Sequence, residues 1–366
     1  MKISCRLPAK SNIIIFGLDS ESLVSIFNSN NIDYSIYDQK LILVNINLIF
    51  IYKFIINILK CYGSCGFLKL FYNVYHLTNL QIISPKSIFT QSDNDTLMHW
   101  LIKYKNTINF IAIQNGLRTK HELKYLKKEH IECYKHDILL MFGQNEEDFF
   151  NSMNVNINKS IKIGSLRLGL FLELKKTFNK KYDICLMSEV FRLPNQDSKF
   201  YKLQKELYNH VYEMNKAISF YAKETKKSII VALRKSHIDE QKEYFRNIFG
   251  DNVIFTSNES KYSSYEATCM SEITLAFFST VLLESLALGN KVLSIDTSNS
   301  NLYFNYPSFI KHNYDNHNDF KNHLDKILDM SDHEYKEKSK DILNYSMSMN
   351  INNLPHNQIL KFTREF

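Results

Sequence analysis

The sequence predicts an α/β fold made of two doubly wound halves, each with a parallel sheet between helices. Its 366 residues exceed one ordinary α/β domain and suit two of about 150–180 residues. Short apolar runs alternate with helical patterns, as in βαβ units, on both sides of a charged stretch at 166–181. Hydrophobic residues make up 45% of the chain, so each half can bury a core. We therefore expect an N-terminal domain at 1–165 and a C-terminal domain at 166–366.

In the N-terminal half, helices alternate with strands that end in turn residues. Ser20 is a candidate N-cap for the first helix, and Asp93 or Asp95 for a later one. The predicted strands are 11–17, 33–37, 41–46, 87–90, 110–114, 137–142 and 160–163. The predicted helices are 20–29, an apolar stretch ending near 62, 67–77 and 96–104.

The segment 41–59 is mostly apolar and requires a membrane test. Asn45, Asn47, Lys53 and Asn57 interrupt it, whereas a spanning helix needs roughly 20 residues with few polar groups. A buried strand followed by an apolar helix explains the segment better. A helix resting on a bilayer surface stays open as the alternative.

The C-terminal half repeats the alternation. The predicted strands are 182–187, 228–233, 253–256, 273–276 and 291–295, and the predicted helices are 199–226, 239–249 and 281–288. Gly289 suits the left-handed position that closes a helix. Helices follow residue 296, and the last of them are expected to pack back on the N-terminal domain. In doubly wound sheets, ligands bind where the carboxyl ends of strands face a crevice.

Composition excludes several classes of function. The net charge is +7, but basic residues are spread along the chain, and the short lysine clusters at 124–128 and 175–181 do not form a nucleic-acid stripe. The six cysteines show no CxxC pair and the twelve histidines are scattered, so we expect free thiols and no metal site. No secretory signal opens the sequence, which favours a cytoplasmic protein.

The segment 271–296 carries the most specific chemistry. A strand runs into Phe277-Phe278-Ser279-Thr280 and then directly into an apolar helix. Backbone N–H groups at a helix N-terminus attract anions, so Ser279 and Thr280 are candidates for binding a donor phosphate. Glu284, one turn deeper, could reach a ribose hydroxyl. The alternative is an ordinary Ser279 cap with a solvated Glu284.

Two further strand ends in the same half carry polar groups. Arg234 and Lys235 follow the strand 228–233, and cations there suit the phosphates of a nucleotide donor. Ser188 and Glu189 end the strand 182–187 and are also assigned to donor binding. The alternative for Arg234 and Lys235 is a solvated loop, and the alternative for Ser188 and Glu189 is a helix cap.

In the N-terminal half, Gln114, Asn115 and Arg118 follow a buried strand and are candidates for binding an anionic acceptor. Asp93 and Asp95 follow the neighbouring strand, where a general base that deprotonates an acceptor hydroxyl fits. Helix capping is the alternative for either aspartate. A plain turn with a solvated arginine is the alternative for the acceptor group.

Taken together, these segments resemble a family of bacterial surface-carbohydrate biosynthesis proteins, those of O-antigen or capsule. In the first half the resemblance rests on Pro85-Lys86, Asp93–Asp95, Phe110–Arg118 and Ile163–Arg167. In the second half, Ser263–Tyr265, Ala276–Thr280, Leu283-Glu284, Ala287–Gly289 and Val292–Asp296 are similar to the nucleotide-binding half of GT-B glycosyltransferases. The resemblance covers about residues 80–300.

The resemblance implies a GT-B fold, two Rossmann-like domains facing a central crevice. It implies a nucleotide-sugar donor, with a CMP-activated acidic sugar as one candidate, bound by the C-terminal domain. It also implies a glycan or lipid-linked oligosaccharide acceptor on the N-terminal domain, no obligatory metal and no cofactor beyond the donor substrate. A peripheral contact with the inner face of the bacterial inner membrane stays open.

Three alternatives remain at this point. A polyol-phosphate transferase or a sugar-nucleotide epimerase could use the same fold, and a non-catalytic scaffold of polysaccharide assembly could do without a base. The paired glutamates typical of retaining GT-B enzymes are missing from the sequence. Whether the reaction inverts or retains configuration therefore stays open.

Overall fold

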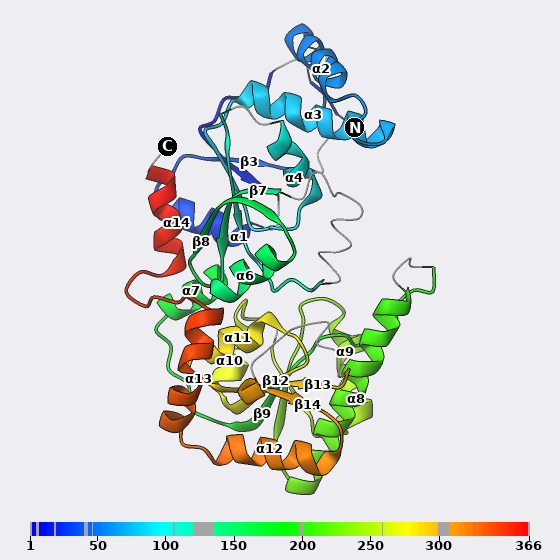
Figure 1. Cartoon of the computed structure of the whole chain (residues 1–366), viewed down its shortest axis with the longest axis vertical. Coiled ribbons are helices and arrows are strands. Elements are labelled where there is room, and N and C mark those ends of the chain that lie inside the picture. Colours follow the sequence, from blue (N-terminus) through cyan, green and yellow to red (C-terminus); the bar gives the residue numbers. More distant parts are fainter. Residues whose placement is uncertain are drawn as a thin grey trace. The chain divides into compact units, whose positions relative to one another are not determined.

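The chain divides into two compact units. The computed structural model describes residues 2–4, 7–17, 20–39, 43–45, 47–104, 107–120, 135–197, 201–257, 259–298 and 308–364. Unit 1 comprises Met1–Arg118, Glu122–Leu170 and Ser348–Phe366, and unit 2 comprises Thr119–His121 and Phe171–Met347 (Figure 1). Each unit holds one six-stranded parallel sheet with helices around it. The predicted α/β fold with two parallel sheets is therefore confirmed.

Unit 1 has the sheet order β3-β2-β5-β6-β7-β8, with every pair parallel. The strands are β2 (Ile13–Phe16), β3 (Ser35–Tyr37), β5 (Ser87–Thr90), β6 (Asn109–Ile113), β7 (Lys135–Met141) and β8 (Asn156–Lys162). Short strands β1 (Lys2–Ser4) and β4 (Leu43–Asn45) form a separate parallel pair. The helices are α1 (Glu21–Ser29), α2 (Leu48–Cys61), α3 (Phe67–Ile83), α4 (Thr96–Lys103), α6 (Gln144–Ser152) and α14 (Pro355–Arg364), and α7 (Leu166–Glu173) begins in unit 1 and ends in unit 2. The strand order reverses between β2 and β5, which is where doubly wound sheets bind ligands.

The central strands of unit 1 are buried on both faces because helices pack against each side of the sheet, and consecutive strand residues point to opposite sides. Ile14 and Phe16 of β2 pack into one core with side chains of α3 and α4. Ile13 and Ile15 pack into a second core on the other face. All four residues of β2 are buried.

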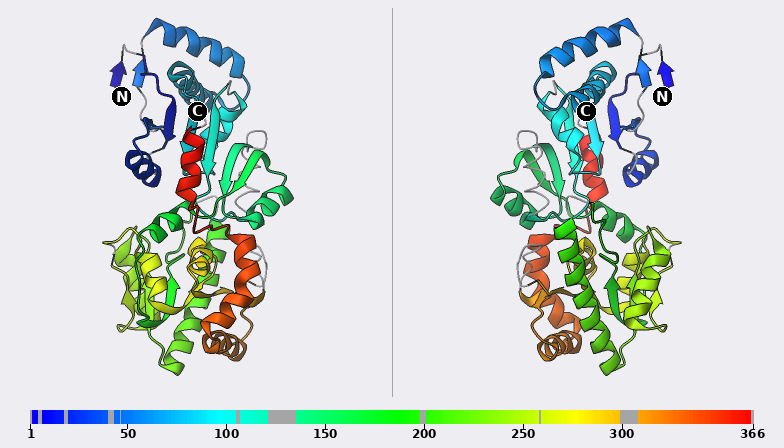
Figure 2. Two further views of the ribbon diagram at one scale, coloured as in Figure 1. Left: turned by 90° about the vertical axis from the view of Figure 1, so that its left-hand side faces the viewer. Right: turned by 90° about the vertical axis from the view of Figure 1, so that its right-hand side faces the viewer.

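The last helix of the chain completes the second core of unit 1. Ile359 and Leu360 of α14 are buried in the same cluster as Ile13, Ile15 and Leu23. The chain returns to unit 1 at Ser348, whose backbone N–H donates to the Phe142 carbonyl over 2.7 Å. The views from either side also show α14 beside the sheet of unit 1 (Figure 2).

Unit 2 has the sheet order β11-β10-β9-β12-β13-β14, again parallel throughout. The strands are β9 (Tyr182–Met187), β10 (Ile229–Ala232), β11 (Ile254–Phe255), β12 (Ser271–Ala276), β13 (Lys291–Asp296) and β14 (Lys311–Asn313). The helices are α8 (Tyr201–Thr225), α9 (Ile238–Phe249), α10 (Ser263–Cys269), α11 (Thr280–Ala287), α12 (His317–Asp329) and α13 (Asp332–Ser346), and a 3₁₀ turn, η1, covers Ser308–Ile310. In order of sequence this sheet is 3-2-1-4-5-6, a Rossmann arrangement whose reversal lies between β9 and β12.

Several predicted boundaries and caps differ from the structure. Helix α3 continues to Ile83, six residues beyond the expected end at Leu77. The charged stretch at 166–181, where the domain boundary is expected, begins with helix α7. Ser20 precedes α1, but its hydroxyl makes no capping hydrogen bond. Helices α6 and α10 were not predicted. The lysine cluster at 124–128 lies outside the described residues.

Gly164 allows the C-terminal segment to lie against unit 1. Its φ of +80° is in the region that favours glycine, and a Cβ there would overlap with Met349 Sδ. We expect Gly164→Ala to lower the free energy of unfolding by more than the roughly 1 kcal/mol that a left-handed φ alone costs. Urea unfolding followed by circular dichroism measures this loss.

Gly63→Ala is the matched control for this substitution. Gly63 has a φ of +81° in the same unit, and a Cβ added there would meet no atom within 4 Å beyond its chain neighbours. The difference between the two variants therefore reports the contacts with Met349 and the Ser348 carbonyl rather than backbone strain. Equal losses would contradict the proposed packing.

Candidate functional site

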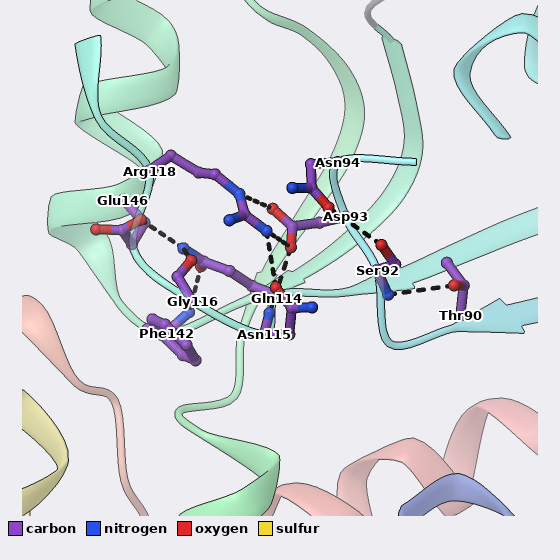
Figure 3. Close-up of polar contacts among 10 residues, drawn as sticks. All are labelled: Thr90, Ser92, Asp93, Asn94, Gln114, Asn115, Gly116, Arg118, Phe142 and Glu146. Carbon is purple, nitrogen blue, oxygen red and sulfur yellow. Dashed lines mark hydrogen bonds and ion pairs between the residues drawn. The ribbon is translucent and has the colours of Figure 1, made fainter. Parts of the chain in front are cut away.

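Polar side chains gather at the carboxyl ends of β5, β6 and β7 in unit 1. Asp93 follows β5, Gln114, Asn115 and Arg118 follow β6, and Glu146 follows β7 in the first turn of α6. Parallel strands end at the same edge of a sheet, so residues far apart in sequence meet there. Figure 3 shows these five side chains pointing toward one another.

Asp93 and Arg118 form a buried ion pair at the centre of this cluster. Arg118 Nε donates to Asp93 Oδ2 over 2.8 Å, and Arg118 Nη2 donates to Asp93 Oδ1 (Figure 3). The side chains are 0% and 7% exposed for the aspartate and the arginine. Asn115 completes the arrangement, because its N–H donates to Asp93 Oδ1 over 3.3 Å and its side-chain oxygen accepts from Arg118 Nη2 over 2.7 Å. A two-pronged pair of this kind fixes the guanidinium plane and both loops.

These contacts change the interpretation of both aspartates. Because both oxygens of Asp93 bind Arg118, the geometry favours a positioning role for Asp93 over that of an exposed base. Asp95 is the N-cap of α4, where its Oδ1 accepts from the N–H groups of Leu97 and Met98 over 2.8 and 3.1 Å. The Oδ1 atom of Asp95 is therefore engaged in helix capping, the alternative role considered for this residue.

Gln114 and Glu146 form the second half of the cluster. Gln114 Nε2 donates to Glu146 Oε2 over 2.5 Å and to the Gly116 carbonyl over 3.1 Å, while its Oε1 accepts from the Phe142 N–H over 3.1 Å. Burial raises the pKa of the Glu146 carboxyl to about 7, and nearby Asp93 acts in the same direction, against the hydrogen bond from Gln114. Glu146 is therefore a carboxyl that exchanges its proton near neutral pH.

In unit 2, Glu189 joins the two strands that flank the reversal of the sheet. It follows β9, is buried, and accepts hydrogen bonds from the backbone N–H groups of Phe277 and Phe278 over 2.6 and 2.8 Å. Burial raises its pKa to about 7, although both of these hydrogen bonds and the charge of Arg234 favour the ionised form. The loop between β12 and α11 is thus held by the end of β9.

Gln241 holds the neighbouring loop after β10. This fully buried side chain on α9 accepts from Ser188 Oγ over 2.6 Å and from the Arg234 N–H over 2.9 Å. Its Nε2 donates to the carbonyls of Arg234 and Ser236 over 3.1 and 2.5 Å. Arg234 Nε donates in turn to the Ser188 carbonyl over 3.0 Å. The loops after β9 and β10 are therefore tied together through one amide.

Helix α11 begins at the end of β12, and Ser279 is its N-cap. The Ser279 hydroxyl accepts from the Val281 N–H over 3.3 Å, so its capping role is present. Ser279 and Thr280 are half-buried, whereas Arg234 and Lys235 are exposed at the end of β10. Glu284 is buried one turn into the helix rather than solvated.

The structure brings most of the predicted site residues into two groups. Asp93, Gln114, Asn115 and Arg118 meet in unit 1, and Ser188, Glu189 and Arg234 are linked in unit 2 to the loop that carries Ser279 and Thr280. Sequence reasoning missed Glu146 and Gln241. A glutamate in the first turn of a helix and a glutamine on an amphipathic helix are ordinary surface residues by pattern, and only burial sets these two apart.

Solved structures share the fold at low sequence identity. The UDP-GlcNAc 2-epimerase of Neisseria meningitidis bound to UDP-GlcNAc matches with a TM-score of 0.56 and 12% identity, over 100% of both chains. Sucrose-phosphate synthase from Thermosynechococcus elongatus matches with a TM-score of 0.52 and 10% identity, over 98% of this chain and 99% of that one. The wall teichoic acid polymerase TagF matches with a TM-score of 0.53 and 12% identity, over 98% of this chain and 89% of the polymerase chain. The fold is thus the two-domain Rossmann-like fold of the GT-B type.

Sequence comparison identifies the family. No curated protein matches the sequence. A family model described as "putative O-antigen biosynthesis protein" matches residues 111–364, more than half of the chain and most of both polar clusters. This agrees with the resemblance carried by the strand-end motifs. The chain therefore belongs to this family of O-antigen biosynthesis proteins.

Proposed function

We propose that the chain is a glycosyltransferase that moves a sugar from a nucleotide-sugar donor to a glycan or lipid-linked acceptor in surface polysaccharide synthesis. The observation that carries this proposal is the loop Phe277–Thr280, held by Glu189 at the sheet reversal of unit 2. Membership of an O-antigen family and the GT-B type of fold support the same class of reaction. Sugar transfer builds such polymers, so the family supplies the biological context.

The donor phosphates are assigned to the N-terminus of α11. The first N–H groups of a helix lack intrahelical partners and attract an anion, and the hydroxyls of Ser279 and Thr280 add donors. Arg234 and Lys235 are exposed cations in the loop after β10. Strand β10 lies two strands from β12 in the same sheet, and both loops leave the carboxyl-end edge. Together they would neutralise the negative charge that grows on the leaving nucleotide as the glycosidic bond breaks.

Glu189, Ser188 and Gln241 act on this site by holding its loops. Glu189 fixes the direction of the Phe277 and Phe278 N–H groups, and Gln241 fixes the Arg234 backbone. A preorganised loop binds a phosphate without first losing conformational entropy. Glu284 is buried, so we propose that it supports the helix rather than contacting the ribose from solvent.

The acceptor is assigned to the cluster of unit 1. Asn115 is exposed, so its side-chain amide is assigned to a hydroxylated or anionic sugar. Arg118 is buried and paired with Asp93, so we propose that it contributes positive charge and holds the Asn115 side chain in place. A general base works best with a pKa near the working pH. Glu146, with a pKa of about 7, fits this better than the ion-paired Asp93, and we propose it as the titrating group of the cluster. Asp95 remains the second candidate for the base.

A sugar-nucleotide epimerase is the second candidate function. It is favoured by the likeness to the UDP-GlcNAc 2-epimerase over the full length of both chains. An epimerase needs the same phosphate site but no acceptor, because its sugar stays on the nucleotide or returns to it.

Release of free nucleotide separates these two functions. We expect the full chain, incubated with a panel of CMP, GDP and UDP sugars, to release nucleotide faster when a lipid-linked oligosaccharide extract from a surface-glycan-producing bacterium is added. The released nucleotide is measured by chromatography. Conversion of the donor to an isomeric sugar nucleotide, unaffected by the extract, would establish the epimerase instead.

Removing the two hydroxyls at α11 tests the donor site. We expect Ser279→Ala with Thr280→Ala to lower the affinity for the nucleotide about a hundredfold or more, because two hydrogen bonds to a charged group contribute about 1.5–3 kcal/mol each. A thermal-shift screen against CMP, CDP, GDP and UDP and their sugars first identifies the ligand, and calorimetric titration then measures the affinity.

The control for this experiment removes a similar cap elsewhere in unit 2. Ser331 is the N-cap of α13 and accepts from the Glu334 N–H over 3.2 Å. Ser331→Ala is expected to cost about 1 kcal/mol of stability with unchanged nucleotide affinity. Unchanged affinity in the double variant, with its fold intact, would rule out the assignment of the phosphate.

The titration of Glu146 predicts a pH dependence of stability. Because its pKa is raised from 4.5 to about 7, the folded chain keeps a proton that the unfolded chain loses above pH 4.5. Its contribution to the free energy of unfolding is therefore complete below that pH and falls as the pH rises to about 7. As the pH rises from about 5 to 8, we expect the free energy of unfolding of the wild type to fall by roughly 2–3 kcal/mol more than that of Glu146→Gln.

Urea unfolding at the two pH values measures this difference. The control is Glu21→Gln, which removes a carboxyl that is exposed on the same unit. The same pH dependence in wild type and Glu146→Gln would show that Glu146 does not titrate in this range.

A further inference from the structure

Helix α2 and the start of α3 expose large apolar side chains to solvent, a set that we call the apolar ridge. It includes Leu48, Tyr52, Ile55 and Leu59 of α2, Tyr62 after it, and Leu68 of α3, each between 53% and 85% exposed. The four α2 residues recur at intervals of four, three and four, which places them along one face of the helix. An exposed patch of this extent marks an interaction surface rather than chance.

The orientation of α2 is fixed with its polar residue inward. Asn57 is buried, and its Nδ2 donates to Thr78 Oγ1 over 3.0 Å and to Gln81 Oε1 over 2.9 Å, both on α3. Rotating α2 to hide its leucines would break these buried hydrogen bonds and expose Phe50 and Cys61. The apolar face therefore points outward because the packing against α3 holds it there.

The segment that carries the ridge has charged side chains of one sign only. The sequence contains no aspartate or glutamate between Asp38 and Asp93, whereas five lysines fall in that interval, at 40, 53, 60, 69 and 86. Lys60 of α2 and Lys69 of α3 are exposed beside the ridge. An apolar face with positive rims complements a surface that is apolar inside and anionic outside.

We propose that the apolar ridge is the surface by which this chain docks on an anionic phospholipid bilayer. Leucine and isoleucine side chains enter the acyl boundary, Tyr52 and Tyr62 lie at headgroup level, and the lysines contact the lipid phosphates. A second copy of the chain fits less well, because a two-fold contact through this face would bring lysine against lysine.

The length of α2 suits a helix lying on the membrane. Its 14 residues extend about 21 Å, less than the hydrocarbon core of about 30 Å. In the described part of the chain, no helix combines the length and the apolar character needed to cross a bilayer. The docking surface is independent of the activity proposed above and is tested without it.

Vesicle co-sedimentation of the full chain tests the proposal. We expect binding to vesicles of phosphatidylcholine with phosphatidylglycerol, weaker binding to phosphatidylcholine alone, and a loss as salt is raised. Lys60→Glu with Lys69→Glu should lower the partition coefficient at least about thirtyfold, since each lysine near an anionic surface contributes about a factor of five. Leu48→Ser with Leu59→Ser should lower it about tenfold or more.

Matched substitutions elsewhere in unit 1 are the controls. Lys10→Glu with Lys361→Glu changes the same number of exposed charges, and Ile351→Ser removes an exposed apolar side chain outside the ridge. Both should retain most of the binding, and circular dichroism checks that every variant folds. Equal binding to neutral and anionic vesicles, no binding at all, or binding that the ridge variants leave unchanged would overturn the proposal. Light scattering that shows a dimer lost in the Leu48→Ser, Leu59→Ser variant would assign the ridge to a second copy instead.

Discussion

A single buried carboxylate joins the two strands between which the sheet of unit 2 reverses. Glu189 comes from the end of β9 and accepts the first two N–H groups beyond β12. The loop that leads into α11 takes its direction from these two bonds, and so does every group assigned to the donor phosphate on that loop. Gln241 repeats the principle one strand farther along, where one amide satisfies Ser188 and the Arg234 backbone. In both places a side chain supplies hydrogen bonds that strand ends cannot make for themselves.

In unit 1, the loops at the carboxyl ends of the strands are joined by an ion pair and an amide rather than by a single carboxylate. There the ion pair of Asp93 and Arg118 joins the ends of β5 and β6, and Gln114 connects the end of β6 to Glu146 beyond β7. Removing a charge from water is costly unless it is paired or loses its charge. Asp93 is paired, while the pKa of Glu146 is raised to about 7 and that of Glu189 to a similar value. Buried carboxyls poised near neutrality collect at functional sites more often than elsewhere, which is a physical reason to assign a site to each unit.

Much of this fold could be predicted from the sequence, and the reasons for success and failure are physical. Strands such as Tyr182–Met187 are apolar runs between turn residues, so local pattern suffices to find them. The grouping of Asp93, Gln114, Asn115 and Arg118 was predictable because parallel strands share an edge. Their roles were not, since the choice between base, cap and ion-pair partner depends on distances that sequence does not contain. Glu146 and Gln241 were missed for the same reason. Helix α2 shows a third limit, because an apolar helix with one asparagine does not reveal which face is turned inward.

The return of the chain at Ser348 makes unit 1 discontinuous in sequence. Most of its sheet precedes unit 2, whereas Ile359 and Leu360 of its second core follow unit 2. Unit 2 lies within a continuous stretch for nearly all its length. A fragment ending near residue 170 carries the strands of unit 1 but not the helix that covers one face of them, so cutting this chain in two does not yield two native halves.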